Sequence, residues 1–323
     1  MTQTKLAARQ YQLEAIDAVR REWHAGNRKT AVVMPTGTGK TITFATMADS
    51  WLSNGHRDDG PVLVLAHRDE LVRQAQHKIQ EVAPALSVGI LKAEKRELAG
   101  DVIVASVQTL ARSNRRAELP RISMCIIDEC HHATAETYRA VLDHIGEVPV
   151  AGFTATLARG DGAALGDVWD SVAYRMDLLD AIRDGHLVDA RGIRVTLPGL
   201  DLDDVAYRNG DYAEGDLGRA MLAAGAPDEI AKVYLEHAAD RKGLVFTPSV
   251  DTAHAVAEAL NEAGIPAASI WGAMPMELRR QVLADAYHGN VQVLVNCMVL
   301  TEGFDWPEAS AVVVARPTAS PAP

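Results

Sequence analysis

The sequence predicts an α/β protein made of two parallel-sheet domains in tandem. Short apolar runs alternate with segments of helical periodicity, which is typical of doubly wound parallel sheets. This alternation occurs twice, before about residue 160 and again after about residue 242. Only the first series contains a Gly-rich turn followed by Lys-Thr, so the second domain is expected to be a partner to the first.

The composition is that of a soluble globular protein. The 323 residues are enough for two ordinary domains, with 48% apolar and 23% charged residues. No apolar run has the length of a membrane span, and the polar segment Met1–Gln10 does not resemble a signal peptide. Three cysteines suit a reducing compartment. We therefore expect a cytoplasmic protein that does not bind membranes.

The charge is unevenly distributed along the chain. The net charge of −11 argues against a generally basic nucleic-acid binder. Residues 1–160 carry 20 Lys and Arg against 18 Asp and Glu, whereas residues 161–323 carry 12 against 25. Any contact with nucleic acid is therefore expected from local clusters of residues, and not from the field of the whole protein.

The strongest local signal follows the first apolar run, Thr30–Met34, which predicts a buried strand. A helix is predicted at Ile42–Leu52, and between the two lie Pro35, Thr36, Gly37, Thr38, Gly39, Lys40 and Thr41. Strand, Gly-rich turn, Lys-Thr and helix in this order predict a phosphate-binding loop. Its one departure is Met34, which stands where the pattern usually has its first Gly.

Each part of this loop has a chemical reason. Gly37 and Gly39 let backbone N–H groups turn towards phosphate oxygens, and the N-terminus of the following helix favours an anion. Lys40 is expected to reach the β- and γ-phosphates, and Thr41 to hold Mg²⁺. The loop therefore predicts a nucleoside triphosphate site.

A helix is predicted from Ala8 to about Trp23, and Gln12 lies in its first turns. A side-chain amide offers a donor and an acceptor together and could pair with adenine. A solvated glutamine on a helix surface is the simpler interpretation, and the residue by itself leaves both open.

Two carboxylates end a later strand of the first series. Strands are expected at Val62–Ala66, Val88–Leu91, Asp101–Ala105, Ile122–Ile127 and Val148–Phe153. Asp128 and Glu129 follow the fourth of these, and carboxylates beside a buried strand are costly unless they have a function. Ligands bind at this edge of open parallel sheets. We expect Asp128 to hold Mg²⁺ through its water shell, and Glu129 to orient and deprotonate the attacking water.

Further polar residues lie at the same edge. His131 is expected to signal from this site, and Thr154 and Thr156 could couple it to the second domain. A zinc site from Cys125, Cys130, His131 and His132 is the disfavoured alternative. All four residues lie on one strand and its turn, and neither a paired C-x-x-C nor an H-E-x-x-H pattern is present.

The stretch 161–242 is expected to be a linker or insert. A partly helical segment, Trp169–Ile182, precedes a strand predicted at Ile193–Leu197. Six acidic residues and one Arg between Leu200 and Asp216 indicate an exposed acidic loop, and a helix is predicted at Pro227–Ala238. The expected domains are therefore 1–160 and 243–323, on either side of this stretch.

The second series repeats the alternation without a phosphate loop. Strands are predicted at Gly243–Phe246, Ala267–Ile270, Val291–Val295 and Ala311–Ala315, and helices at Val250–Ala263 and Met276–Tyr287. This pattern predicts a second parallel sheet.

Taken together, these features resemble the superfamily 2 helicases, in the DEAD/DEAH-like group with phage and bacterial DNA helicases. Arg9–Gln12 is similar to the adenine-reading Q motif, Pro35–Thr41 to motif I, Ala66–Leu71 to Ia, Ser106–Leu110 to Ib, Asp128–His131 to a D-E-x-H motif II, Thr154–Thr156 to III, Phe246–Ser249 to IV and Thr301–Asp305 to V. No single motif is decisive, but their order and spacing together are specific, from Arg9 to Trp306.

The resemblance implies two RecA-like domains, with ATP and Mg²⁺ in the cleft between them and a nucleic-acid strand across both. DNA is favoured over RNA by the resemblance alone. Nucleotide contacts are expected from Arg9, Gln12, Gly303 and Asp305 in addition to the phosphate loop. Backbone contacts to nucleic acid are expected from Arg68, Gln108, Thr109 and Cys297, which suits an enzyme that moves on any sequence.

One departure from the family bears on activity. Relatives carry motif VI, Q-x-x-G-R-x-x-R, after the strand that follows motif V, whereas here Ala311–Ala315 is followed only by Arg316–Pro323. We expect the second domain to be incomplete, with a missing C-terminal segment that supplies the arginine finger, a group that contributes on the order of 10³ to 10⁵ in rate. Three hypotheses follow: an ATP-dependent helicase or translocase; an ATP- and nucleic-acid-binding fragment that hydrolyses ATP weakly; and an unrelated phosphate-loop kinase or signalling NTPase, which leaves the second series unexplained.

Overall fold

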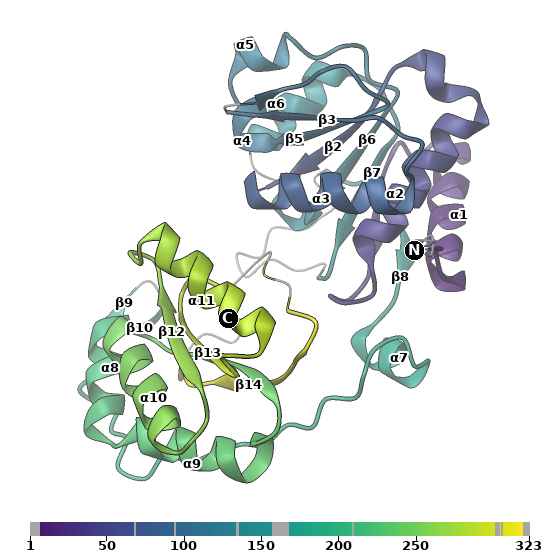
Figure 1. Ribbon diagram of the computed structural model, residues 1–323. Helices are drawn as coiled ribbons and strands as arrows, with labels where there is room; N and C mark the ends of the chain where they lie inside the picture. The colour runs from purple at the N-terminus through teal and green to yellow at the C-terminus, as the bar shows by residue number, and fades with distance from the viewer. Residues whose placement is uncertain are drawn as a thin grey trace. The chain divides into compact units, whose positions relative to one another are not determined.

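The computed structural model describes residues 7–318 except 68, 94, 134–135, 157–167, 209, 301–303 and 305. The chain divides into two compact units, Met1–Arg191 and Gly192–Pro323 (Figure 1). The stretch expected as a linker, 161–242, is divided between them. Strand β8 (Ser171–Arg175) pairs with the first sheet, whereas helices α8 (Glu214–Ala223) and α9 (Ala226–Ala238) contribute to the core of the second unit.

In its described residues, the first unit contains an eight-stranded sheet in the order β4-β3-β5-β2-β6-β7-β1-β8. The pair β3–β4 is antiparallel, and the other pairs are parallel. The strands before β8 are β1 (Lys29–Val33), β2 (Val62–Ala66), β3 (Val88–Lys92), β4 (Lys95–Arg96), β5 (Val102–Ser106), β6 (Met124–Asp128) and β7 (Val150–Thr154). The order β2-β6-β7-β1 places the carboxyl ends of these four strands side by side.

Helices cover both faces of this sheet. They are α1 (Gln10–His24), α2 (Lys40–Trp51), α3 (Asp69–Val82), α4 (Val107–Leu110), α5 (Ser113–Arg116), α6 (Glu136–Ile145) and α7 (Leu178–Arg183), with the short turns η1 (Leu52–His56), η2 (Arg57–Asp59) and η3 (Cys130–His132). Along β2, Val62 and Val64 belong to the core under α2 and α3, and Leu63 and Leu65 to the core under α4 and α6. Burial on both faces explains why the strands are continuous apolar runs.

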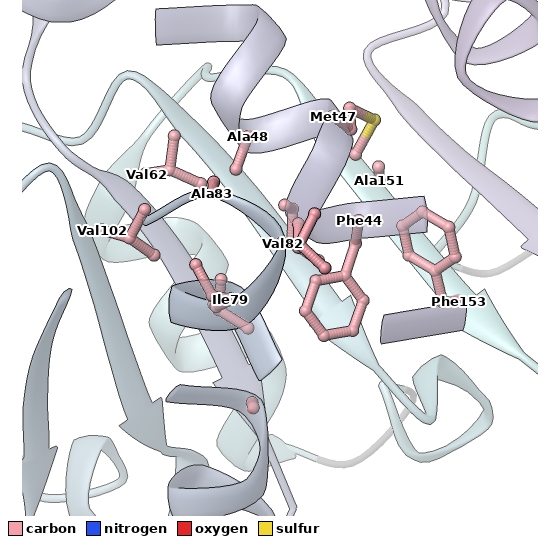
Figure 2. Close-up of a cluster of buried hydrophobic side chains, with 14 of the residues drawn as sticks. Phe44, Met47, Ala48, Val62, Ile79, Val82, Ala83, Val102, Ala151 and Phe153 are labelled. Carbon is pink, nitrogen blue, oxygen red and sulfur yellow. The ribbon is translucent and has the colours of Figure 1, made fainter. Parts of the chain in front are cut away.

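The first of these cores packs α2 and α3 against the strands (Figure 2). Phe44 of α2 meets Phe153 of β7 edge to face, with ring centroids 5.7 Å apart. Ile79 and Val82 of α3 belong to the same cluster. The helix that follows the phosphate loop is therefore anchored to the sheet by aromatic packing, which fixes the position of its N-terminus.

In the stretch 161–242 one local prediction holds in part and one was wrong. The segment predicted as partly helical from Trp169 to Ile182 contains the start of α7 at Leu178. It begins as β8, which was not predicted, because Ser171 pairs with Thr30 of β1 and the hydroxyl of Ser171 donates to that of Thr30 at 2.8 Å. The strand predicted at Ile193–Leu197 is not formed. Ile193 and Val195 are each 47% exposed, so this apolar alternation has no sheet to join.

The second unit is smaller. Its described residues form a parallel four-stranded sheet in the order β12-β13-β11-β14 and a two-stranded hairpin, β9–β10. The elements are β9 (Tyr207–Arg208), β10 (Asp211–Tyr212), β11 (Lys242–Phe246), β12 (Ala267–Trp271), β13 (Val293–Cys297), β14 (Ala309–Val314), α10 (Val250–Glu262) and α11 (Met276–His288). Helices α8, α9 and α10 share one core on this sheet, and α11 contributes to another. The acidic stretch Leu200–Asp216 contains the β9–β10 hairpin and the start of α8.

In the described part of the chain, every helix is too short or too polar to span a lipid bilayer.

Candidate active site

The phosphate loop joins β1 to α2 and has the conformation that its glycines permit. Gly37 and Gly39 have φ angles of +86° and +79°, in the left-handed region that favours glycine. Gly39 is the N-cap of α2 and has no side chain to accept from the first-turn N–H groups. The hydroxyl of Thr38 donates to the carbonyl of Pro35 at 2.6 Å, which closes the loop on itself. The N-terminus of α2 is therefore left open to an anion.

Side chains from the first turn of helix α1 donate hydrogen bonds to this loop. The hydroxyl of Tyr11 donates to the carbonyl of Thr38 at 2.7 Å, and Nε2 of Gln12 donates to the same carbonyl at 2.9 Å. Oε1 of Gln12 accepts the backbone N–H of Arg9 at 2.8 Å, so the buried amide has protein partners at both ends. A Cβ at Gly39 would lie 2.6 Å from Nε2 of Gln12. The structure thus shows Gln12 as a support of the loop, while its pairing with adenine stays a prediction.

Sequence reasoning missed three residues that touch this region. Tyr11 lies next to Gln12, and its aromatic character beside a predicted binding residue was a usable signal. The ring of His186 lies 4.2 Å from that of Tyr11, and Cδ2 of Leu187 lies 3.0 Å from the place of a Cβ on Gly37. Both follow α7, some 150 residues along the chain, and no local pattern pointed to them.

The structure brings Lys40 and Glu129 together. Lys40 begins α2 and is buried, and its Nζ lies 3.6 Å from Oε1 of Glu129. Asp128 is the last residue of β6, and Glu129 follows with a φ angle of +49°. Such a conformation is uncommon for a residue with a side chain and is often found at functional sites. Here it directs the Glu129 carboxylate towards the start of α2.

The two neighbouring carboxyl groups differ in acidity. Burial, and then the charge of Glu129, raise the pKa of Asp128 to about 6. Burial opposes ionisation of Glu129 as well, but the hydrogen bond from His131 and the charge of Lys40 outweigh it and hold its pKa below the ordinary value. The site therefore stabilises the charge of Glu129 and compensates that of Asp128 only in part, which suits a carboxylate that meets a cation.

His131 links Glu129 to the end of β7. Its Nδ1 lies 3.4 Å from Oε2 of Glu129 and 3.1 Å from the hydroxyl of Thr154. The hydroxyl of Thr154 donates to the carbonyl of Thr156 at 2.9 Å and accepts the N–H of Thr156 at 3.2 Å. Because its proton is used in this way, Thr154 accepts from His131, and Nδ1 carries the hydrogen.

The remaining predicted residues lie apart from this network or outside the described residues. Thr36 is exposed on the loop, and Thr41 is half-buried in the first turn of α2. Gln108 is exposed on α4, whereas Thr109 beside it is buried. Cys297 is buried at the end of β13, where burial raises the pKa of its thiol. Arg68, Gly303 and Asp305 lie outside the described residues.

The donor set suits a hard cation better than zinc. Asp128 and Thr41 offer oxygen ligands, and Mg²⁺ commonly takes one or two protein ligands and completes its shell with water and phosphate. The thiols of Cys125 and Cys130 are buried, and burial raises the pKa of each. Within the described ranges, no three His, Cys, Asp or Glu side chains are grouped so as to hold a metal ion.

A positive-φ loop at a helix N-terminus, facing a Lys–Glu–His network at the edge of a parallel sheet, defines a nucleotide-binding α/β protein. Comparison with known proteins identifies the family. Residues 5–159 match the model of the type III restriction enzyme res subunit, and residues 226–322 match the helicase conserved C-terminal domain. With the helicase relatives below, these matches show that the chain belongs to the superfamily 2 helicases.

Curated relatives come from several organisms. The protein named "Putative ATP-dependent helicase IRC3" of Saccharomyces cerevisiae is 33% identical, over 97% of this chain and 47% of that protein. A 51.5 kDa protein of a Lactococcus phage is 28% identical over 88% and 58% of the two chains. The type I restriction enzyme EcoAI endonuclease subunit of Escherichia coli is 26% identical over 78% and 34%. This chain spans about half the length of the first relatives that it matches.

Solved structures share the fold. The type ISP restriction-modification enzyme LlaBIII, bound to DNA, superposes with a TM-score of 0.70 at 17% identity, over 97% of this chain and 26% of that chain. The helicase domain of Hef from Pyrococcus furiosus gives a TM-score of 0.61 at 18% identity, over 97% and 90%. The two units are therefore RecA-like domains in tandem, as predicted.

Proposed function

We propose that this chain is the motor of an ATP-dependent DNA translocase or helicase. One observation carries the proposal: Lys40 and Glu129 lie 3.6 Å apart at the mouth of a phosphate loop whose helix N-terminus is uncapped. Helix N-terminal N–H groups and a lysine are the usual partners of a nucleoside triphosphate, and a carboxylate beside them can orient water.

Each residue has a role in this proposal. Gly37 and Gly39 give the backbone room to surround the phosphates, and Lys40 neutralises their charge. Mg²⁺, held by Asp128 and Thr41, would supply charge neutralisation at the phosphate oxygens. His131 and Lys40 lower the pKa of Glu129 and so keep its carboxylate ionised. In that form Glu129 can orient the attacking water and accept its proton. His131 contacts both Glu129 and Thr154, and its role in this proposal is to transmit a movement of the Glu129 carboxylate to Thr154.

DNA is proposed as the track because of the relatives. Several are named as subunits of restriction enzymes, and LlaBIII was solved bound to DNA. The yeast Dbp5 structures, with TM-scores of 0.54, are bound to RNA and share the same fold at 18% identity, so fold alone does not distinguish the two. The compartment stays a prediction as well, since a Schizosaccharomyces pombe relative is named mitochondrial.

The test is ATP hydrolysis by this chain with and without single-stranded DNA or RNA, using wild type and Glu129→Gln. We expect ATP turnover that DNA stimulates more than RNA, and that Glu129→Gln removes while leaving ATP binding intact. Binding of ATP and DNA without turnover would favour the alternative, a nucleotide- and nucleic-acid-binding fragment. Failure of the wild type to bind ATP would refute both.

A further inference from the structure

Three histidine rings lie in contact between the ends of two neighbouring strands. The ring of His67 is stacked on that of His132, whereas the ring of His131 is tilted by 42° to that of His132. His67 follows β2, and His131 and His132 lie in η3 after β6. The ring centroids of His131 and His132 are 4.0 Å apart, and those of His132 and His67 are 4.3 Å apart with planes inclined by 17°. Strands β2 and β6 are paired through Leu65 and Ile127, which brings their carboxyl ends to adjacent positions.

The stack continues the network of the nucleotide site. Glu129 contacts Lys40 with one oxygen and His131 with the other, at 3.6 and 3.4 Å. His131 then contacts His132, and His132 contacts His67. A continuous series of side-chain contacts therefore runs from the start of α2 to the end of β2, entirely within the first unit.

The series ends at His67, next in sequence to a residue predicted to contact nucleic acid. His67 directly precedes Arg68, the predicted nucleic-acid contact, and helix α3 begins at Asp69. The hydrogen bond from His131 to Thr154 already connects the site with β7. The stack is a second connection, towards a different strand end, and neither His67 nor His132 has a part in the chemistry described above.

We propose that His132 and His67 are positioning residues that couple the nucleotide site to the β2–α3 connection, and thereby to bound DNA. This inference rests on the proposed function. When phosphates draw Lys40 away from Glu129, the carboxylate and the imidazole of His131 adjust together. Because neighbouring rings are already in contact, with centroids 4.0 and 4.3 Å apart, movement of His131 towards His132 displaces His132 and then His67.

The first experiment measures DNA stimulation of ATP turnover in His132→Ala, with His144→Ala on the exposed side of α6 as the matched control. We expect His132→Ala to keep its turnover without DNA and to lose about fivefold or more of the stimulation, the size of a typical coupling between sites. His132→Phe, which restores a flat ring, should recover stimulation. Equal losses in the Phe and Ala variants, or unchanged stimulation in His132→Ala, would overturn the proposal.

A second measurement separates coupling from simple destabilisation. Coupling between binding sites is reciprocal, so a non-hydrolysable ATP analogue should change the DNA affinity of the wild type about fivefold or more, and that of His132→Ala much less. His67→Ala and the double variant should resemble His132→Ala, since residues of one series are not additive. If the losses of the two single variants add up in the double variant, the proposal that His132 and His67 act in one series is overturned. If the wild type itself neither binds nor hydrolyses ATP, the proposed function has failed instead.

Discussion

The two units place a helix after a sheet strand in the same way but finish its N-terminus differently. In the first unit, residues 34–39 join β1 to α2, and the N-cap Gly39 offers no side chain to the helix. In the second, residues 247–249 join β11 to α10, and the hydroxyl of the N-cap Ser249 accepts the N–H of Thr252 at 3.2 Å. One helix N-terminus is open to an external anion, and the other is already capped.

The polar side chains at the strand ends beside these helices also have different partners in the two units. In the first unit Asp128 and Glu129 lie at the end of β6 and Lys40 at the start of α2, and their charges are only partly compensated within the protein. In the second unit Asn296 is the last residue but one of β13, and Oδ1 of Asn296 accepts the N–H groups of Val299 and Leu300 at 2.9 and 2.8 Å. Side chains at the second edge hold the protein's own backbone, whereas those at the first edge are arranged for a ligand. We therefore propose the first edge as the phosphate-binding edge.

The largest expected effect comes from Lys40→Ala. Loss of the Lys40 ammonium group at the open helix end should lower ATP turnover by about 10² to 10³, the usual cost of removing a group that stabilises the transition state. Lys78→Ala, which breaks an ion pair with Glu81 on the surface of α3, is the matched control and should not alter turnover. Equal turnover in wild type and Lys40→Ala would contradict the assignment.

Asp128→Asn should separate stability from activity. A carboxyl group whose pKa is raised by folding binds its proton more tightly in the folded state, so the free energy of unfolding falls as the pH rises from about 4 to about 6. The Asn variant has no such loss. It should match the wild type at low pH and be more stable above pH 6, by on the order of 3 kcal/mol, while its turnover is lost.

Denaturant unfolding of both proteins across this pH range measures the difference. Asp143→Asn, on an exposed position of α6, should show no comparable gain. A variant Asp128→Asn that is less stable than the wild type at pH 7.5 would mean that the Asp128 carboxylate is compensated within the nucleotide-free protein.

Gly39→Ala should impair the loop both by strain and by contact. The left-handed backbone costs about 1–2 kcal/mol for a residue with a Cβ, and that Cβ would lie 2.6 Å from Gln12. Gly146→Ala is a close control, since its φ angle is +75° and nothing lies within 4 Å of an added Cβ. Titration with a fluorescent ATP analogue should show about tenfold weaker binding for Gly39→Ala, equal to about 1.4 kcal/mol. Gly146→Ala should bind the analogue as tightly as the wild type.

The smallest effect is expected at the capped helix. Ser249→Ala removes the N-cap of α10 and should lower the stability of the second unit by about 1 kcal/mol, with ATP affinity unchanged. Thermal unfolding and the same ATP titration give both quantities. A large loss of ATP affinity would show that the second helix also serves the nucleotide, and the contrast between the two edges would not hold.

Much of the first unit could be predicted because its signals are local. Strands buried on both faces are continuous apolar runs, and the order of Gly37, Gly39 and Lys40 is legible without any tertiary information. Asp128 and Glu129 were recognisable because charge is costly at the end of a buried strand. In each case the physical cause lies within a few residues of its effect.

The rest depends on contacts between distant parts of the chain. Strand β8 is an edge strand with partly exposed side chains, and its pairing with β1 joins residues 141 positions apart. Leu187 near Gly37 and His186 beside Tyr11 also join parts of the chain that are far apart in sequence. The stack of His67 on His132 follows from the strand order β2-β6, which no local pattern reports.

The most direct measurement is a crystal structure of this chain with Mg²⁺ and a non-hydrolysable ATP analogue. The account predicts phosphate oxygens within hydrogen-bond distance of the N–H groups of residues 37–41, Mg²⁺ next to Asp128, and Lys40 moved from Glu129 to the phosphates. A nucleotide bound elsewhere, with Lys40 still paired to Glu129, would contradict it.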